Sequence, residues 1–266
     1  MTNAQRRVVV TGAGSGIGQA VARKLAATGA QVVLNDLDPE GVAKVARELQ
    51  ARAVVCDAST EAGVAQLVAE ATNELGDIDV WFGNAGVERG RGLDADDDSW
   101  QTSYEVNVLA HVRAARLLVP RWLERGQGRY VVTASAAGLL TMLGSPAYSV
   151  TKHGAIAFAE WLSVTYRHRG IVVQAVCPQG VRTPMLASAG GLQTLLGRDG
   201  TLSPEEVADV VSQALTHRRF LILPHREVRD YVARKAEGID PWLAAMNRVQ
   251  QRLETASGLG TYGGRE

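Results

Sequence analysis

The sequence lacks several features that would point to particular classes of protein. Its 266 residues contain two cysteines, Cys56 and Cys177, which do not form the spacing of a metal site and whose low number favours a reducing compartment. Lys plus Arg and Asp plus Glu each number 28, so the formal net charge is zero and nothing indicates a nucleic-acid or anionic-membrane partner. No apolar run approaches the roughly 18 residues of a membrane-spanning helix, and the first residues hold no signal-peptide core. We therefore expect a cytoplasmic protein with no bound metal, no nucleic-acid partner and no membrane partner.

What the sequence does contain is sufficient for one α/β domain with a large core. Hydrophobic residues make up 46% and charged residues 21%, which are ordinary values for a globular protein. No repeat and no linker divides the chain, so we expect residues 1–266 to form a single domain. Within it, glycines interrupt apolar residues at 181–202, which predicts a mobile lid over a site. Residues 225–266 are expected to form a C-terminal helical extension.

The segment 7–18, RVVVTGAGSGIG, organises the rest of the chain. Its three consecutive valines, Val8 to Val10, predict a strand buried on both faces. Glycines then occupy every second position from Gly12 to Gly18, and apolar residues at helical spacing follow from Ile17 to Thr28. A glycine turn alone is equally consistent with an ordinary tight turn. Between a strand and a helix it favours a dinucleotide site, because backbone N–H groups at the helix start can approach a pyrophosphate.

Strands and helices are expected to alternate along the whole chain. Short apolar runs predict further strands at 31–35, 53–56, 78–82, 130–134, 171–177 and 220–224. Capped or amphipathic segments between them predict helices, the longest at 100–125 and 146–169. This α/β alternation gives a doubly wound parallel sheet with helices on both faces, which binds ligands at the carboxyl ends of its strands. Five predicted strands end at a polar or loop-forming residue: Asp36, Asp57, Asn84, Ser135 and Pro178.

Other conspicuous side chains receive ordinary structural interpretations. The acidic run of Asp94 and residues 96–98 is expected to be solvated and to favour a helix N-terminus. The histidines His111, His153 and His168 have no metal-like spacing. Phe158 and Trp161 are expected to pack in the core or at a subunit interface.

Asp36 indicates which dinucleotide would bind. It follows the second strand, eighteen residues after Gly18, where a carboxylate can accept hydrogen bonds from the adenosine ribose hydroxyls. It would repel the extra phosphate of NADP, at a cost of about 4 kcal/mol for charges about 4 Å apart in an effective dielectric near 20. Neither Ser15 nor Leu37 offers a compensating cation. NAD is therefore the expected cofactor; the alternative is that Asp36 only caps the next turn.

Tyr148, Lys152 and Ser135 are the candidate reacting groups. Tyr148 and Lys152 lie four residues apart at the start of a predicted helix and so share one face. A tyrosine with a pKa near 10 must lose about 2 to 3 units to act as a base near neutral pH, and a nearby ammonium and an oxidised nicotinamide favour that loss. The pair alone is also consistent with a surface contact. Ser135, at the end of the preceding strand, can polarise the same substrate oxygen and favours the catalytic interpretation.

Taken together these motifs resemble the short-chain dehydrogenases/reductases of about 250 residues. The resemblance covers residues 6–224 and rests on five separated motifs in the right order: residues 11–18, residues 84–86, Asn107, Ser135 and residues 148–152. It implies a seven-stranded Rossmann sheet with Tyr148 as general acid/base, Lys152 on the nicotinamide ribose and Ser135 orienting the substrate. It implies that Asn107 holds a water in a proton relay; by itself, Asn107 could equally be a polar residue that bends a helix.

The resemblance also implies a set of cofactor contacts. Asp57 would contact the adenine, residues 84–86 would pack along the adenosine, and residues 178–183 would contact the nicotinamide side. The family more often has Pro-Gly where this chain has Pro178-Gln179-Gly180, so the local loop geometry can differ. The expected cofactor-binding residues are Gly12, Ser15, Gly16, Ile17, Gly18, Asp36, Leu37, Cys56, Asp57, Ala58, Asn84, Ala85, Gly86, Tyr148, Lys152, Pro178, Gly180, Val181 and Thr183.

The sequence thus predicts an NAD-dependent oxidoreductase that interconverts a secondary alcohol and a ketone. The alternatives are an NADPH-dependent biosynthetic ketoreductase and a non-catalytic NAD-binding sensor or scaffold. Apolar residues around the expected pocket, with Arg182 as the one cation, indicate an apolar and fairly bulky substrate: Leu139, Leu140, Met142, Leu143, Met185, Leu186, Leu192, Leu195 and Leu196. Many of these residues could instead pack within the lid. The apolar content of helices 100–125 and 146–169 exceeds the need of one sheet face, and the family pairs these helices between subunits, which implies a homo-oligomer, either a dimer or a tetramer.

Overall fold

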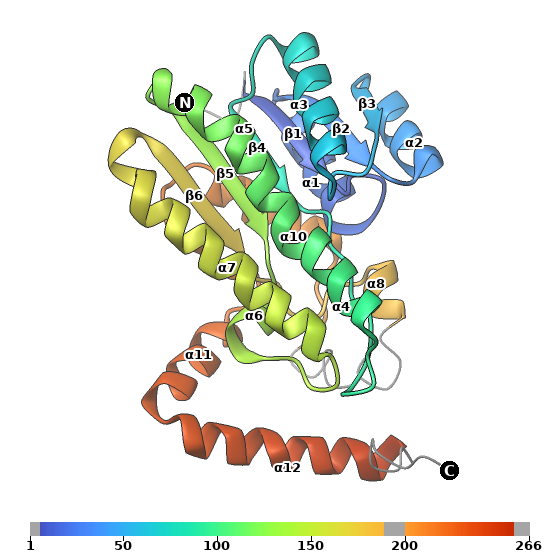
Figure 1. Cartoon of the computed structure of the whole chain (residues 1–266), viewed down its shortest axis with the longest axis vertical. Coiled ribbons are helices and arrows are strands. Elements are labelled where there is room, and N and C mark those ends of the chain that lie inside the picture. The colour runs from blue at the N-terminus through green and yellow to red at the C-terminus, as the bar shows by residue number, and fades with distance from the viewer. Residues whose placement is uncertain (1–5, 189–199, 258–266) are drawn as a thin grey trace.

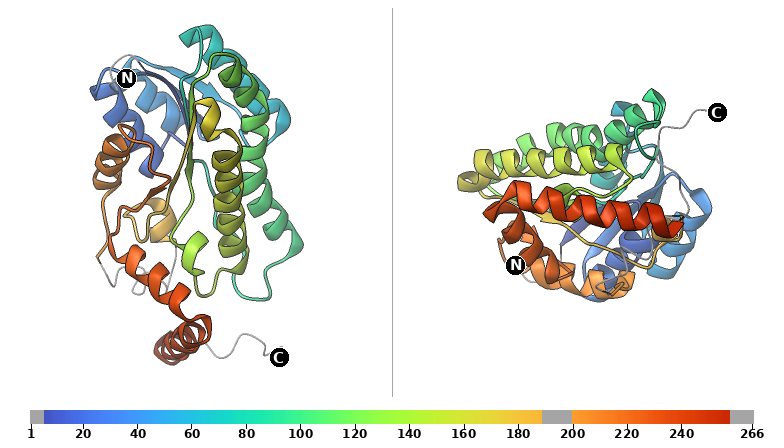
Figure 2. Two further views of the ribbon diagram at one scale, coloured as in Figure 1. Left: turned by 90° about the vertical axis from the view of Figure 1, so that its left-hand side faces the viewer. Right: turned by 90° about the horizontal axis from the view of Figure 1, so that it is seen from below.

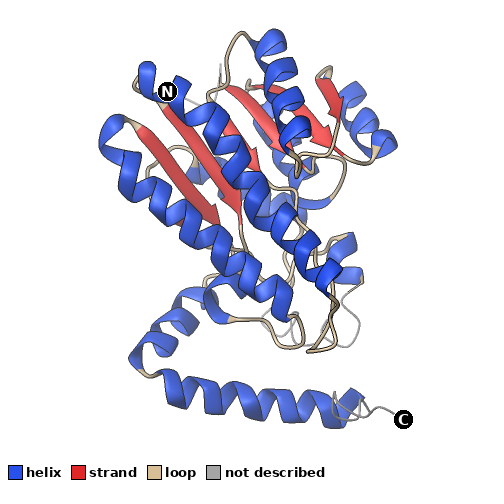
Figure 3. Cartoon of the chain, viewed as in Figure 1, coloured by secondary structure: helices blue, strands red, loops and turns tan. Residues whose placement is uncertain are grey.

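The computed structural model describes residues 6–188 and 200–257, and their centre is a seven-stranded parallel sheet with helices on both faces (Figures 1 and 3). The order β3-β2-β1-β4-β5-β6-β7 reverses direction between β1 and β4, which makes that point the switch where doubly wound sheets bind ligands. The predicted fold class is confirmed. The strands are β1 (Arg7–Thr11), β2 (Gln31–Asp36), β3 (Arg52–Val55), β4 (Val80–Gly83), β5 (Gly128–Thr133), β6 (Ile171–Val176) and β7 (Leu221–Ile222).

Two helical layers enclose the sheet (Figure 2, left). One face is covered by α1 (Gly16–Ala27), α2 (Pro39–Leu49) and α10 (Pro204–Ala214). The other is covered by α3 (Glu61–Leu75), α4 (Asp97–Tyr104), α5 (Ala110–Glu124) and α7 (Pro146–Tyr166). The remaining elements are the π-helical turn η1 (Glu105–Leu109), the 3₁₀ turn η2 (Arg167–Arg169), and the helices α6 (Ala137–Leu140), α8 (Pro184–Ala187), α11 (Glu227–Glu237) and α12 (Ile239–Ser257).

The valines of β1 show why the central strands are continuous apolar runs. Successive side chains of a strand point to opposite faces of the sheet. Val9 packs into the core under α3, α5 and α7, whereas Val8 and Val10 pack into the core under α1, α2 and α10. All three are fully buried, because both faces of a doubly wound sheet are covered by helices.

The long helix expected at 100–125 is interrupted, which the sequence did not predict. It begins at Asp97 behind the N-cap Asp96, whose carboxylate accepts a hydrogen bond from Ser99 N at 2.8 Å, so part of the acidic run caps a helix as expected. The helix then widens into the π-helical turn η1 before continuing as α5. Asn107 lies in that turn and bonds to residues distant in sequence, contacts that helical periodicity does not encode.

The C-terminal helices extend away from the three-layer body. α12 runs across the end of the molecule at which the strands have their carboxyl ends, and α11 joins it to the sheet (Figures 1 and 2). The expected helical extension is thus present as far as residue 257, although α11 was not foreseen as a separate helix because Val228 is its only buried residue. Of the expected lid, residues 189–199 lie outside the described residues. On either side of them are α8 and a parallel bridge between Val181 and Leu202. Among the described helices, none is both long and apolar enough to cross a membrane.

Candidate active site

A cavity of about 840 Å³ lies at the carboxyl ends of the strands, at the β1/β4 switch point. One end of its wall comes from the β1–α1 turn and the ends of β2 and β3, and the other from α6, α8, α11 and α12. The volume lies within the usual range for small-molecule and cofactor sites.

The glycine turn is shaped by backbone requirements at three positions. Gly12 and Gly16 adopt positive φ values of +64° and +53°, which side-chain-bearing residues rarely adopt. A Cβ at Gly18 would lie 2.1 Å from the carbonyl oxygen of Gly12, so only glycine lets α1 pack this closely on the turn. Gly12 and Gly16 line the cavity, whereas Gly18 lies behind it and holds the helix against the turn.

Asp36 is positioned at the cavity wall by the same turn. One carboxylate oxygen accepts a hydrogen bond from Gly14 N at 2.8 Å, and the other accepts one from Asp38 N at 3.1 Å. The residue therefore caps local backbone, as the simpler interpretation expected, and it also lines the cavity. Leu37 beside it is 64% exposed, and both it and Ser15 line the cavity without bringing a positive charge.

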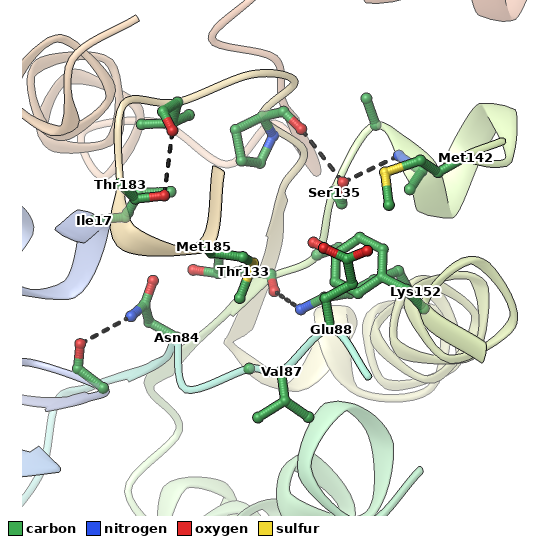
Figure 4. Close-up of a pocket in the computed structure, with 18 of the residues that line it drawn as sticks. Ile17, Asn84, Val87, Glu88, Thr133, Ser135, Met142, Lys152, Thr183 and Met185 are labelled. Atoms are coloured by element: carbon green, nitrogen blue, oxygen red, sulfur yellow. Dashed lines mark hydrogen bonds between the residues drawn. The ribbon is translucent and has the colours of Figure 1, made fainter. Parts of the chain in front are cut away.

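Hydrogen bonds of Thr11 and Asn84 join the end of β4 to the end of β1. The Thr11 hydroxyl accepts hydrogen bonds from the backbone N–H groups of Asn84 (2.9 Å) and Ala85 (3.0 Å). The Asn84 amide donates to the carbonyl oxygens of Thr11 (3.1 Å) and Gly12 (3.2 Å). These bonds keep Asn84 and Ala85 at the cavity wall beside the glycine turn (Figure 4).

Tyr148, Lys152 and Ser135 meet in the cavity, as their motifs predicted. Tyr148 lies in the first turn of α7, and the Lys152 ammonium is 5.6 Å from the centre of its ring. Lys152 Nζ donates to the carbonyl oxygen of Thr133 at 2.9 Å, at the end of β5 (Figure 4). Ser135 Oγ accepts a hydrogen bond from Ala137 N at 3.1 Å and donates to Pro178 O at 3.5 Å, and the Ser135 hydroxyl is near enough to Tyr148 to influence its pKa.

Burial raises the pKa of Tyr148 and lowers the pKa of Lys152. Loss of solvent raises the pKa of Tyr148 to about 12, although the Ser135 hydroxyl acts in the lowering direction. Loss of solvent lowers the pKa of Lys152 to about 8. In the protein alone Tyr148 is thus a neutral phenol at neutral pH, and a further positive charge is needed to make it a base.

Asn107 lies just behind the cavity wall. Its side-chain oxygen accepts a hydrogen bond from Val87 N at 3.0 Å, and its amide donates to Val87 O at 2.9 Å and to Thr151 Oγ1 at 3.1 Å. A Cβ at Gly86 would lie 3.1 Å from Lys152 Nζ and 3.2 Å from Asn107 Oδ1, so the two side chains approach the backbone of this loop closely. Asn107 and Lys152 therefore lie close together, as expected. The side-chain amide of Asn107 is hydrogen bonded to Val87 and Thr151.

Most of the remaining predicted cofactor residues form the cavity wall. Besides those named above, the wall contains Ile17, Cys56, Asp57, Ala58, Gly86, Pro178, Gly180, Val181 and Thr183. Both cysteines are free thiols, and burial raises the pKa of Cys56 to about 11 and that of Cys177 to about 12. The predicted site residues that do not line the cavity are Gly18 and Asn107.

Several wall residues were missed by the sequence analysis. Thr133 Oγ1 and His111 Nε2 are buried without a hydrogen-bond partner among the described residues, although both residues line the cavity. Such polar atoms at a wall fit a bound molecule that supplies the missing partners. Glu88, which follows the loop of residues 84–87, also belongs to the wall. His225 binds the loop after β6 from behind, accepting a hydrogen bond from Gln179 N at 3.1 Å. Of these residues, only Glu88 could have been found from the sequence, because it lies close in sequence to Asn84.

The substrate end of the wall matches the prediction in part. Leu140, Met142, Leu143, Met185 and Leu186 line the cavity, whereas Leu139 packs against the core. Leu192, Leu195 and Leu196 lie outside the described residues. Arg182 is not part of the wall and pairs with Glu206, and a different cation, Arg234 of α11, lines the cavity. α12 contributes an apolar stripe that was not foreseen: Trp242, Ala245, Met246 and Val249.

Comparison with known proteins agrees with this geometry. The sequence profile of the short chain dehydrogenase family matches residues 6–191. A 1-deoxy-11-beta-hydroxypentalenate dehydrogenase of Streptomyces exfoliatus is 38% identical, over 84% of this chain and 84% of that protein. The human epidermal retinol dehydrogenase 2 is 32% identical, over 82% of this chain and 73% of that protein.

A solved structure supports the same assignment. It is a short chain dehydrogenase/reductase from Burkholderia phymatum in complex with NAD, which is 29% identical and superposes with a TM-score of 0.83, covering 90% of this chain and 96% of the other. The chain therefore belongs to the short-chain dehydrogenases/reductases, oxidoreductases that act on CH–OH groups with a nicotinamide cofactor.

Proposed function

We propose that the protein is an NAD-dependent dehydrogenase/reductase that interconverts an apolar, fairly bulky secondary alcohol and its ketone. The observation that carries this proposal is the placement of Tyr148, Lys152 and Ser135 around one point of a cavity whose other end holds Asp36. A protein that only bound the dinucleotide would not need both Tyr148 and Ser135 in the wall of a largely apolar pocket.

Ser135, Tyr148, Lys152 and Asn107 have different roles in proton transfer. Ser135 donates a hydrogen bond to the substrate oxygen, and Tyr148 takes the alcohol proton during oxidation or returns it during reduction. Lys152 keeps its ammonium beside the Tyr148 ring, holds the nicotinamide ribose and favours the phenolate. Asn107 holds the relay water through which the proton leaves. The cofactor, when bound, accepts or supplies the hydride and brings the positive charge that lowers the pKa of Tyr148 from its raised value in the free protein.

The preference for NAD rests on Asp36. Its carboxylate stands at the cavity wall, and the neighbouring wall residues Ser15 and Leu37 are uncharged. The cations of the described wall, Lys152 and Arg234, belong to the end of the cavity formed by α7 and α11. A 2′-phosphate beside Asp36 would therefore meet a like charge without compensation.

The substrate class rests on the wall beyond Tyr148. Leucine and methionine side chains from the α6 loop and α8 line the cavity together with the apolar stripe of α12. The names of two relatives, a hydroxypentalenate dehydrogenase and a retinol dehydrogenase, agree with a substrate that carries a hydroxyl group. The free thiols of Cys56 and Cys177 fit a cytoplasmic location.

The proposal is tested by turnover of secondary alcohols of increasing ring size, followed through the absorbance of the reduced cofactor. We expect oxidation of at least one bulky cyclic alcohol with NAD. Binding of NAD without turnover of any alcohol or reduction of any ketone would contradict the proposal and favour a sensor or scaffold. Higher kcat/KM with NADPH than with NADH would favour the biosynthetic ketoreductase.

We also propose that the protein is a homo-oligomer, a dimer or a tetramer. Apolar side chains that remain exposed on the α4–α5–α7 face include Trp161 (55% exposed) and Val164 (83% exposed) on α7 and Leu117 on α5. Trp161 stacks on Phe158, at 6.2 Å between ring centres, on this outer surface. Light scattering at micromolar concentration should give a multiple of 28.4 kDa, and the mass of one chain would contradict the proposal.

A further inference from the structure

Glu88 is a carboxylate in the part of the cavity that the proposed function assigns to the substrate. It follows the loop after β4 and lines the cavity, with only 8% of its side chain exposed. In Figure 4 it lies on the same side of the site as Ser135, Met142 and Lys152. A carboxylate is costly to bury unless it is paired and hydrogen bonded, so its position in this wall calls for a partner.

Two contacts anchor one oxygen of this carboxylate. Glu88 Oε1 accepts a hydrogen bond from the Ser145 hydroxyl at 2.7 Å, and Arg91 Nη2 lies 3.4 Å from the same oxygen. Ser145 immediately precedes α7, whose first turn carries Tyr148, so the anchor ties the carboxylate to the reacting group. The Arg91 side chain is 37% exposed, which screens its charge. No described residue donates a hydrogen bond to Oε2, which leaves that oxygen available to a ligand.

The charge of Glu88 is isolated from the other acids of the cavity. The other carboxylates in the described wall are Asp36 and Asp57, at the ends of β2 and β3. The wall of the same cavity also contains apolar side chains such as Met142, Leu143 and Met185. The negative charge of Glu88 also raises the pKa of Tyr148, which places the two groups within electrostatic reach. A largely apolar pocket with an anchored carboxylate in its wall can select for a polar substituent.

We propose that Glu88 is a specificity-determining residue that accepts a hydrogen bond from a second donor on the substrate, a hydroxyl or an ammonium on a carbon next to the reacting one. The same carboxylate excludes substrates that carry a carboxylate at that position, because two like charges would meet in a pocket with little water. The inference rests on the proposed function and narrows it: the preferred substrate is apolar in bulk but is a vicinal diol or amino alcohol, or the matching ketone.

The test uses cyclohexanols that differ only at the neighbouring carbon. The probes are cyclohexanol, trans-1,2-cyclohexanediol, trans-2-aminocyclohexanol and trans-2-hydroxycyclohexanecarboxylate. Their binding to the full chain is measured by calorimetry at neutral pH without cofactor, so that this arm depends neither on turnover nor on the choice of NAD or NADP. We expect the ammonium probe to bind at least about tenfold more tightly than the carboxylate probe.

The variant Glu88→Gln keeps the shape and an acceptor for Ser145 but removes the charge. It should reduce the ammonium-to-carboxylate affinity ratio by about tenfold or more, while cyclohexanol binding changes by less than about threefold. Glu88→Asp keeps the charge and should retain most of the ratio. Glu227→Gln, an exposed position at the start of α11 outside the cavity wall, is the matched control and should leave every affinity unchanged.

The same four probes in turnover assays separate this inference from the proposed function. An unchanged affinity ratio in Glu88→Gln, with the thermal unfolding midpoint also unchanged, would overturn the role of Glu88 even if the enzyme oxidises alcohols well. Absence of turnover of any alcohol would contradict the proposed function, while the binding ratio would still decide on Glu88. If Glu88→Gln does not fold, an ammonium-to-carboxylate ratio near one in the unaltered chain, or a ratio lost in Glu88→Asp, overturns the inference.

Discussion

The two ends of the cavity are built in different ways. At the cofactor end the shape is set by backbone: positive φ values at Gly12 and Gly16, a close approach at Gly18, and N–H groups at the start of α1. At the substrate end the wall is made of side chains from α6, α8, α11 and α12, segments that are far apart in the sequence. A site formed by backbone atoms allows few residue types at each position and needs a fixed spacing between them. A site formed by side chains can change its residues without disturbing the sheet.

The largest effect is expected where the two ends meet, at Tyr148. Tyr148→Phe removes the proton acceptor but keeps the ring, so the rate should fall by at least about 10²-fold, or about 2.7 kcal/mol in activation free energy. Folding and NAD affinity should survive, as judged by thermal unfolding and calorimetry. Tyr104→Phe, on the exposed side of α4, is the control and should retain full activity.

The same prediction states in which direction the rate of oxidation changes with pH. Oxidation needs the phenolate, so its rate should rise with pH through an apparent pKa, and that rise should be absent in Tyr148→Phe. Burial raises the pKa of Tyr148 to about 12 in the free protein. The positive charge that the oxidised cofactor brings acts in the opposite direction. The kinetic pKa should therefore lie below about 10, whereas the phenol of the cofactor-free protein titrates above it. Near-full turnover by Tyr148→Phe would contradict the assignment.

The next effect tests the backbone-made end. In Gly18→Ala the new Cβ would meet the Gly12 carbonyl at 2.1 Å, so α1 and the turn must separate. We expect a loss of about 1–3 kcal/mol in the free energy of unfolding, typical of overpacking, together with a large loss of NAD affinity. Gly126→Ala is a useful contrast, since a Cβ there meets nothing within 4 Å although φ is positive. It should cost stability without weakening NAD binding, and equal NAD affinities in the two variants would contradict the backbone argument.

The difference between the two ends of the cavity also explains which parts of the fold and of the site could be predicted from the sequence. The strand–turn–helix order and the acid at the end of β2 are local patterns, so the parallel sheet and the position of Asp36 followed from the sequence. Tyr148 and Lys152 share a helix face, and Ser135 lies just beyond the end of β5, so their meeting followed as well. The π-helical turn at Asn107 could not be predicted, because it accompanies bonds to Val87 and Thr151. The contribution of α12 to the wall depends on tertiary placement alone.

A smaller effect is expected at Asp36, where charge rather than backbone decides. The unaltered enzyme should favour NAD over NADP by at least about tenfold in kcat/KM, or about 1.4 kcal/mol. Asp36→Ala should weaken that preference by removing the repulsion of the 2′-phosphate. Asp38→Ala is the neighbouring control: Asp38 caps α2 and does not line the cavity, so its loss should lower stability but not the preference. Comparable activity of the unaltered enzyme with both cofactors would contradict this prediction.

The smallest effect is expected at the side-chain-made end, on α12. Trp242, Met246 and Val249 recur at the spacing of one helix face and line the cavity, whereas Leu243 on another face is 56% exposed. Met246→Ala removes part of an apolar wall, and each buried methylene contributes about 0.8 kcal/mol, so KM for a large alcohol such as cyclododecanol should rise by about three- to tenfold. KM for cyclohexanol, which has much less apolar surface to bury against α12, should stay unchanged, and so should NAD affinity. Leu243→Ala should alter none of these values. An equal loss for both alcohols would mean that α12 supports the fold of the site rather than contacting the substrate, and the proposed bulky substrate would lose its main support.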